Sequence, residues 1–127
     1  METTNISANT QQPQNTEAEA SLLGALLIDS DAIVKIADII APRDFFEKRH
    51  ELIYEAITYL YDHHKAIDVL TLSDRLRDAG YLEAVGGPAY LTELTNFVPT
   101  AAHVEQYADI VAQKALRRRL ISASNDI

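Results

Sequence analysis

The sequence predicts an all-α fold: a compact globule of about five to six helices, followed by a protruding C-terminal helix. Three observations predict it. Apolar residues recur at helical spacing in successive segments, and no strand pattern stands out, because the one short candidate, residues 69–72, follows a helix-capping Asp68. Residues that cap or end helices separate these segments. The length of 127 residues, 47% of them hydrophobic, suits one globular domain with its own core.

The first helix is expected to begin at Thr16, after a polar arm of residues 1–15 that has little to bury and is expected to be disordered. Thr16 and Glu19 have the spacing of a capping box, in which each side chain accepts a hydrogen bond from a backbone N–H. Gly24 lies within the apolar stripe, where it weakens the helix but permits close packing of another element. The stripe consists of Leu22, Leu23, Leu26 and Leu27.

The next two helices are predicted from their apolar spacing. A second helix is expected to end at Pro42, because proline cannot continue a helix. Phe45 and Phe46 follow in a short turn and are expected to fill the core. A third helix is predicted over residues 47–62. The inward residues are Ile33, Ile36, Ala37 and Ile40 in the second helix, and Leu52, Ile53, Ala56, Ile57 and Leu60 in the third.

Two shorter helices are predicted from their capping residues. Asp68 is the expected N-cap of a fourth helix over residues 69–79, and Gly80 follows as its C-terminal cap. Pro88 suits the first position of a fifth helix over residues 88–96. The inward residues are Leu72 and Leu76 in the fourth helix, and Tyr90, Leu91 and Leu94 in the fifth.

The sixth helix is predicted over residues 101–127, with Thr100 as its N-cap, and its apolar residues change face along its length. At 100° per residue, the first half has a seam within about 60° of Val104. In the second half the apolar side lies at about 80–160° from Val104. The seam contains Tyr107, Ala108, Val111 and Ala115, and the later stripe contains Ala112, Leu116, Leu120, Ala123 and Ile127.

This change of face indicates a change of partner, since a helix buries its apolar stripe against one neighbour. A hairpin or a subunit interface is favoured over a seam that wraps around the globule. Leu116, Leu120, Ala123 and Ile127 are the predicted interface residues. Ile127 is followed by no capping Gly or Pro, which predicts that the helix continues in a longer protein.

Charge and composition exclude several classes of function. The net charge of −8 disfavours a stand-alone nucleic-acid binder, because that affinity comes mainly from neutralising phosphates. Cysteine is absent from the sequence, which excludes thiolate zinc sites and thiol catalysis. The sequence contains neither a long apolar run nor a signal-peptide pattern, so we expect a cytoplasmic protein without a membrane partner. Four of the 11 basic residues lie within residues 114–119, and a solvated face is favoured over a phosphate site.

The sequence predicts no catalytic, metal or cofactor site in this chain. His50-Glu51 begins like a zinc-protease motif, but Tyr54 stands where the second histidine would be needed. Gly86 and Gly87 are interpreted as turn residues, because no phosphate-binding loop motif surrounds them. The pattern therefore favours an interaction or assembly domain over a small hydrolase with an unrecognised site.

Four stretches in order are similar to one family. They are PQNTEAEASLLGALLID (residues 13–29), RDFFEKRHELIYEAI (43–57), IDVLTLSDRLRDAGYLEAVGGPAYLTEL (67–94) and VPTAAHVEQYADIVAQKALRRRLI (98–121). Together they resemble the N-terminal domain of the bacterial replicative DNA helicase, the DnaB family. The resemblance implies a helical globule over residues 16–99 and the first arm of a dimerising helical hairpin over residues 100–127, cut before its second arm.

The resemblance also implies a function. The family's whole enzyme is a hexamer that unwinds duplex DNA at the replication fork with ATP and Mg²⁺, and its motor domain is absent here. Its N-terminal domains pair into dimers, and three dimers form a collar that receives the C-terminal domain of primase. DNA would be contacted only through the parent ring. Tyr90 and Ile121 are the candidate primase contacts, although a core position for Tyr90 is an equal alternative. A free-standing acidic adaptor or regulator of a replication complex is the alternative function.

Overall fold

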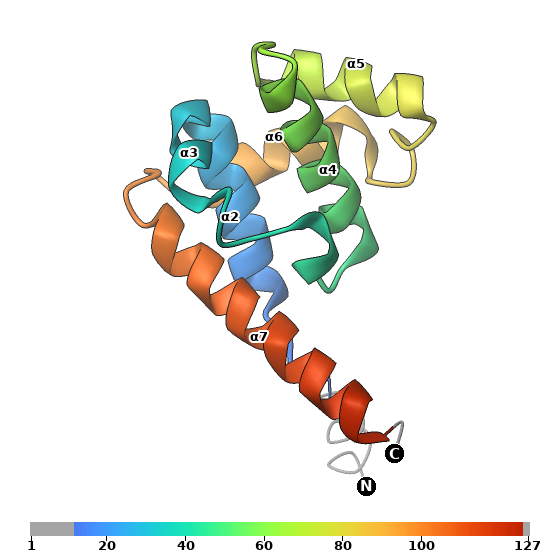
Figure 1. Cartoon of the computed structure of the whole chain (residues 1–127). Helices are drawn as coiled ribbons and strands as arrows, with labels where there is room; N and C mark the ends of the chain where they lie inside the picture. The colour runs from blue at the N-terminus through green and yellow to red at the C-terminus, as the bar shows by residue number, and fades with distance from the viewer. Residues whose placement is uncertain (1–11, 126–127) are drawn as a thin grey trace, which may run out of the picture.

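Helices make up all of the regular structure between residues 12 and 125, which are the residues that the computed structural model describes. The predicted all-α class is therefore confirmed, and Figure 1 shows the arrangement. The elements are α2 (Thr16–Ile28), the 3₁₀ turn η1 (Ser30–Ala32), α3 (Ile33–Ile36), the 3₁₀ turn η2 (Pro42–Asp44), α4 (Lys48–Asp62), α5 (Val69–Ala79), α6 (Gly87–Thr95) and α7 (Val104–Asn125).

Helix α2 is the centre of the core, in contact with α4, α6 and α7. It is apolar on almost every side, and nine consecutive residues from Ala18 to Leu26 are buried. Gly24 allows α6 to approach closely, because a Cβ atom at this position would overlap the carbonyl oxygen of Leu94. The predicted close packing at Gly24 is thus explained by the crossing of α2 and α6.

The predicted capping box at the start of α2 is wrong. Asn15 is the N-cap, and its side chain accepts a hydrogen bond from the N–H of Ala18 at 2.9 Å. Thr16 is already the first helical residue, and Glu19 turns into the interior instead of back to the cap. The predicted arm of residues 1–15 falls largely outside the described residues, but Asn15 and the Pro13 carbonyl within it make defined contacts.

The second predicted helix is shorter than expected. It consists of the turn η1 and the single helical turn α3, and it ends at Ile36 rather than near Pro42. Ile33, Ile36 and Ile40 are buried as predicted, but Ala37 is exposed. Of the two phenylalanines that follow, Phe45 lies in the core, whereas Phe46 is 41% exposed and the prediction for it is wrong.

Helices α4, α5 and α6 form within one residue of their predicted bounds. The caps of α5 explain why its bounds were predicted correctly. Asp68 accepts from the N–H of Thr71 at 2.9 Å, and Gly80 takes the left-handed conformation with φ of +84°. All ten residues that were predicted to face inward on these helices are buried. Helices α5 and α6 also pack against each other, so the second half of the globule closes over α4 and α2.

Helix α7 is long, with 22 residues and a length of about 33 Å. It begins at Val104 rather than at residue 101, because Thr100 caps a preceding turn by accepting from the N–H of Ala102 at 3.1 Å. The predicted seam is confirmed: Val104, Ala108, Val111 and Ala115 are buried, Tyr107 is partly buried, and α7 packs on α2 and α3. Ala112 was predicted in the later stripe, but it also packs against the core. Figure 1 shows its C-terminal half extending past the globule.

Candidate protein-interaction surface

An exposed apolar stripe lies on the outer half of α7. Leu116 is 50% exposed and Leu120 is 61% exposed, and Ala123 is also exposed. These residues follow one another at spacings of four and three, so they share one face of the helix. Ile127, the fourth predicted interface residue, lies outside the described residues. We call Leu116, Leu120 and Ala123 the α7 stripe.

Ile121 lies on a different side of α7 from the stripe. It is 39% exposed, and it is offset from Leu120 by about 100° around the helix axis. A single flat partner that covers Leu120 would therefore leave most of Ile121 accessible. The structure keeps the two predicted contacts, the stripe and Ile121, on separate faces of the same helix.

Two arginines fasten the outer half of α7 to the globule. Arg118 donates to the carbonyl oxygen of Pro13 and to that of Asp44, both at 2.7 Å. Arg119 forms an ion pair with the Asp44 carboxylate at 2.9 Å. The other Asp44 oxygen accepts from the N–H of Ala41 at 2.8 Å. The prediction that this basic cluster is a solvated face holds for Arg119, which is exposed although it is paired, but not for Arg118, which is partly buried on two carbonyl groups.

Tyr90, the other predicted primase contact, lies in the interior with 8% of its surface exposed. Its hydroxyl oxygen is 2.6 Å from Nε2 of His50, and the guanidinium of Arg49 lies 3.8 Å from the centre of its ring. Burial raises the pKa of the Tyr90 phenol, although the nearby charge of Arg49 opposes this. Of the two alternatives for Tyr90, the structure shows the core position.

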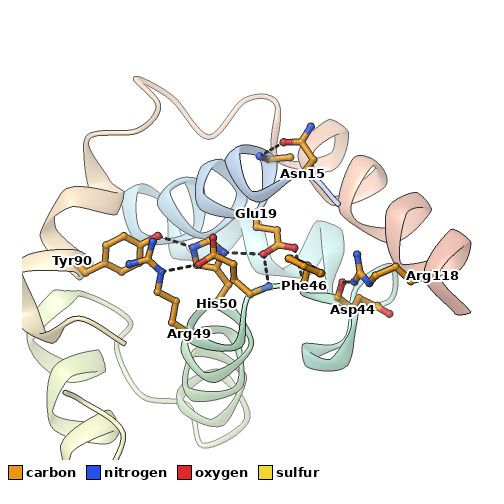
Figure 2. Close-up of polar contacts among 10 residues, drawn as sticks. Asn15, Glu19, Asp44, Phe46, Arg49, His50, Tyr90 and Arg118 are labelled. Atoms are coloured by element: carbon orange, nitrogen blue, oxygen red, sulfur yellow. Dashed lines mark hydrogen bonds and ion pairs between the residues drawn. The ribbon is translucent and has the colours of Figure 1, made fainter. Parts of the chain in front are cut away.

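His50 connects Tyr90 to Glu19, as Figure 2 shows. Glu19 accepts from the N–H of Phe46 at 2.6 Å and from that of Glu47 at 3.3 Å, and it lies 2.8 Å from Nδ1 of His50. An ionised carboxylate can only accept hydrogen bonds, so Nδ1 carries a proton. In neutral His50, Nε2 then accepts from the Tyr90 hydroxyl.

This Glu19–His50–Tyr90 chain joins α2, α4 and α6, and it is closed to solvent. Glu19 and His50 are each 1% exposed, so they offer almost no surface to a substrate. A histidine between a carboxylate and a hydroxyl resembles a catalytic arrangement, but its burial assigns it a structural role. Among the described residues no cluster of ligands fit for a metal ion occurs, and no helix there is long and apolar enough to cross a membrane.

Sequence reasoning missed Glu19, His50 and Arg118 as the residues that join the elements. Glu19 has the local spacing of a capping residue, and this spacing hid its long-range role. His50 lies in the first turn of α4, 31 residues away from Glu19, so no local pattern links the two. One signal was present: an acid inside an otherwise apolar segment, which needs a partner when the segment is buried.

Comparison with known proteins identifies the family to which this chain belongs. The family model of the DnaB-like helicase N-terminal domain matches residues 11–113. The replicative DNA helicase DnaB of Leifsonia xyli is 44% identical over 115 residues, and the replicative DNA helicase DnaC of Bacillus subtilis is 41% identical over the same length. These matches cover 91% of the chain, but the chain spans only 25% of either relative.

Solved structures agree with the sequence comparison. The N-terminal domain of DnaB helicase from Mycobacterium tuberculosis has a TM-score of 0.89 and 41% identity, and the match covers 91% of this chain and 81% of that one. A DnaB-like replicative helicase, described together with its interactions with primase, has a TM-score of 0.79 and 26% identity. That match covers 88% of this chain and 26% of the other. The predicted resemblance is confirmed, and the chain belongs to the family of DnaB-like helicase N-terminal domains.

Proposed function

We propose that this chain is the N-terminal collar domain of a hexameric, ATP-dependent replicative DNA helicase, where it assembles the oligomer and docks primase. The observation that carries the proposal is the α7 stripe, an exposed apolar face on a helix that is firmly held at its other face. Exposed leucines on a rigid element are typical of a surface that another protein covers. Because the chain belongs to a helicase family, the α7 stripe would be covered by neighbouring parts of the assembled helicase.

The stripe is proposed to pack against the second arm of a helical hairpin and against the hairpin of a neighbouring subunit. The chain would then form dimers, and three dimers would form a collar over the motor ring. ATP and Mg²⁺ would bind only in the motor domain, outside the part of the relatives that this chain matches. DNA would be contacted through the assembled ring, and the protein would act in the cytoplasm, together with the chromosome.

Primase is proposed to bind over the joint between paired hairpins, with Ile121 as a direct contact. Ile121 is exposed and lies away from the α7 stripe, so it stays accessible when the stripe is covered. One relative of similar fold is described with its interactions with primase, which supports this partner. Tyr90 is proposed to act from the interior, by holding α6 on His50, because its ring offers little surface to a partner.

A single pair of variants tests both halves of the proposal in a longer piece of the protein that includes the second arm. Leu120→Asp places a charge in the stripe and is expected to shift the sedimentation coefficient from oligomer to monomer. Ile121→Ala is expected to keep the oligomer and to weaken binding of the primase C-terminal domain at least tenfold. Thr92→Asp, at an exposed polar position on α6, is the matched control and is expected to change neither.

The two results separate the roles. An oligomer that survives Leu120→Asp would refute the stripe as the subunit interface. Normal primase affinity of Ile121→Ala, measured by isothermal titration, would remove Ile121 from the docking site while leaving the assembly role standing.

A further inference from the structure

A basic hollow lies beside the two arginines of α7, on the side away from the α7 stripe. Its volume is about 490 Å³, and α7, the turn η2 and the residues before α2 form its walls. The guanidinium groups of Arg43, Arg118 and Arg119 line it, together with the hydroxyl of Ser122 and the amide of Gln12. All five side chains can donate hydrogen bonds, and the three arginine side chains cannot accept any. The apolar side chains of Ala115 and Ile121 complete the lining, so hydrogen-bond donors make up most of it.

The charge of this hollow is opposite to that of the whole protein. The chain carries −8 overall, whereas three arginines meet here. Only one of the carboxylates in the described ion pairs, that of Asp44, lies on this group, and it pairs with Arg119. The arginines therefore keep an excess of two positive charges. Like charges that gather in one place repel one another, and a bound anion would relieve this repulsion.

The arginines also have donors to spare. Each guanidinium has five N–H donors. Arg118 uses two on the carbonyls of Pro13 and Asp44, which hold its plane in place, and Arg119 uses one on the Asp44 carboxylate. Arg43 is exposed and forms no ion pair with any residue between 12 and 124. Carbonyl oxygens hold the guanidinium of Arg118 in place beside the exposed side chain of Arg43. The two groups are therefore preorganised to bind an oxyanion.

We propose that this hollow binds a phosphomonoester group, such as the terminal phosphate of a nucleotide. A phosphomonoester carries about −1.5 to −2 charges at pH 7, which matches the excess of two, and its three oxygens match the forked donors of arginine. A lone carboxylate would neutralise only half of that excess. The α7 stripe does not line this site, but Ile121, the proposed primase contact, lies at its wall.

The test is a titration of the 127-residue chain with three probes at low ionic strength: inorganic phosphate, adenosine monophosphate and adenosine. The readout is the set of ¹⁵N resonances of the arginine Nε–H groups. We expect both phosphate probes to shift the resonances of Arg43 and Arg119, and adenosine to shift neither. A nucleotide that binds at least tenfold tighter than inorganic phosphate would identify the nucleotide as the source. Equal binding would identify the free ion.

Arg43→Gln is the decisive variant, because Arg43 makes no ion pair within the described residues that its loss would break. It is expected to weaken phosphate binding at least tenfold with an unchanged melting temperature, and Arg119→Gln is expected to do the same with a small loss of stability. Arg77→Gln on α5 is the control, since Arg77 is an exposed arginine in an i,i+3 pair with Asp74. Adenosine binding as tightly as its monophosphate, or wild-type phosphate affinity in Arg43→Gln, would overturn the proposal.

Discussion

One buried carboxylate, that of Glu19, connects α2 with the start of α4 and, through His50, with α6. A buried ionised group is costly unless hydrogen bonds replace the water it loses. Here two backbone N–H groups and one imidazole N–H do so. These two backbone N–H groups belong to Phe46 and Glu47, directly before α4. Such N–H groups at the start of a helix have no partner within the helix itself. Glu19 therefore caps α4 from a distant helix, a role that no spacing within α2 can reveal.

Glu19→Gln tests this role. The amide keeps the shape of the carboxylate but has one oxygen to accept where three donors converge, so at least one buried N–H loses its partner. We expect the free energy of unfolding to fall by about 2–4 kcal/mol. Urea denaturation measures it, and Glu17→Gln is the control, because Glu17 lies on the same helix and is exposed. Equal stabilities of the two variants would refute the distant cap.

Tyr54 gives the protein a dependence on pH at the alkaline end. Burial, and to a lesser extent the charge of Asp44, raises its pKa from 10.0 to about 12. Between these two values the unfolded chain releases the phenolic proton and the folded chain keeps it, so stability falls as pH rises. Below pH 10 this contribution is fully present. Urea denaturation at pH 9 and pH 11 should show a larger loss for the wild type than for Tyr54→Phe, and equal losses would contradict the assignment.

At the scale of single elements, local chemistry decided what the sequence could predict. Helix α5 has a side-chain N-cap and a glycine C-cap, and both of its ends were predicted correctly. The segment before Pro42 has a helical pattern, but only one turn of it is α-helical, because tertiary packing buries its isoleucines without a continuous helix. The Glu19–His50–Tyr90 chain was missed, since its members lie 31 and 40 residues apart.

Gly24→Ala tests the crossing of α2 and α6. In an isolated helix this change is favourable by about 1 kcal/mol. Here the new methyl group would overlap the Leu94 carbonyl, which belongs to backbone and cannot rotate away. We expect a net loss of about 1–3 kcal/mol in the free energy of unfolding. Gln113→Ala on the exposed side of α7 is the control, expected to stay within about 0.5 kcal/mol of the wild type. A stabilised Gly24→Ala protein would show that the crossing is looser than described.

At the scale of the whole molecule, the charges are segregated. The part of the chain before Lys114 is strongly acidic, and four of the 11 basic residues lie together on the outer half of α7. The change of apolar face along α7 was predicted from spacing alone, since it depends only on the geometry of one regular helix. The contacts of Arg118 and Arg119 with the globule were not predicted, because their partners lie 74 to 105 residues away in the sequence.

This distribution predicts weak binding of single-stranded DNA. The net charge of −8 repels a phosphate backbone, and the basic hollow is too small to neutralise more than one group of it. An oligonucleotide without a terminal phosphate should bind no tighter than about 1 mM at near-physiological salt, weaker than typical non-specific binding. Fluorescence anisotropy measures this affinity, and a low-micromolar dissociation constant would show that the charge distribution has been misjudged.

The way α7 is fixed makes it a lever arm. Its seam packs on α2 and α3, and Arg118 and Arg119 fasten it to η2, so the globule sets the direction in which the helix points. Over a helix of about 33 Å, a tilt of about 5° displaces the far end by roughly 3 Å. Small shifts of the globule are thereby magnified at the tip. In the proposed assembly, substitutions deep in the core, far from the α7 stripe, would then change the angle at which copies of the chain meet, and with it the closure of the proposed ring.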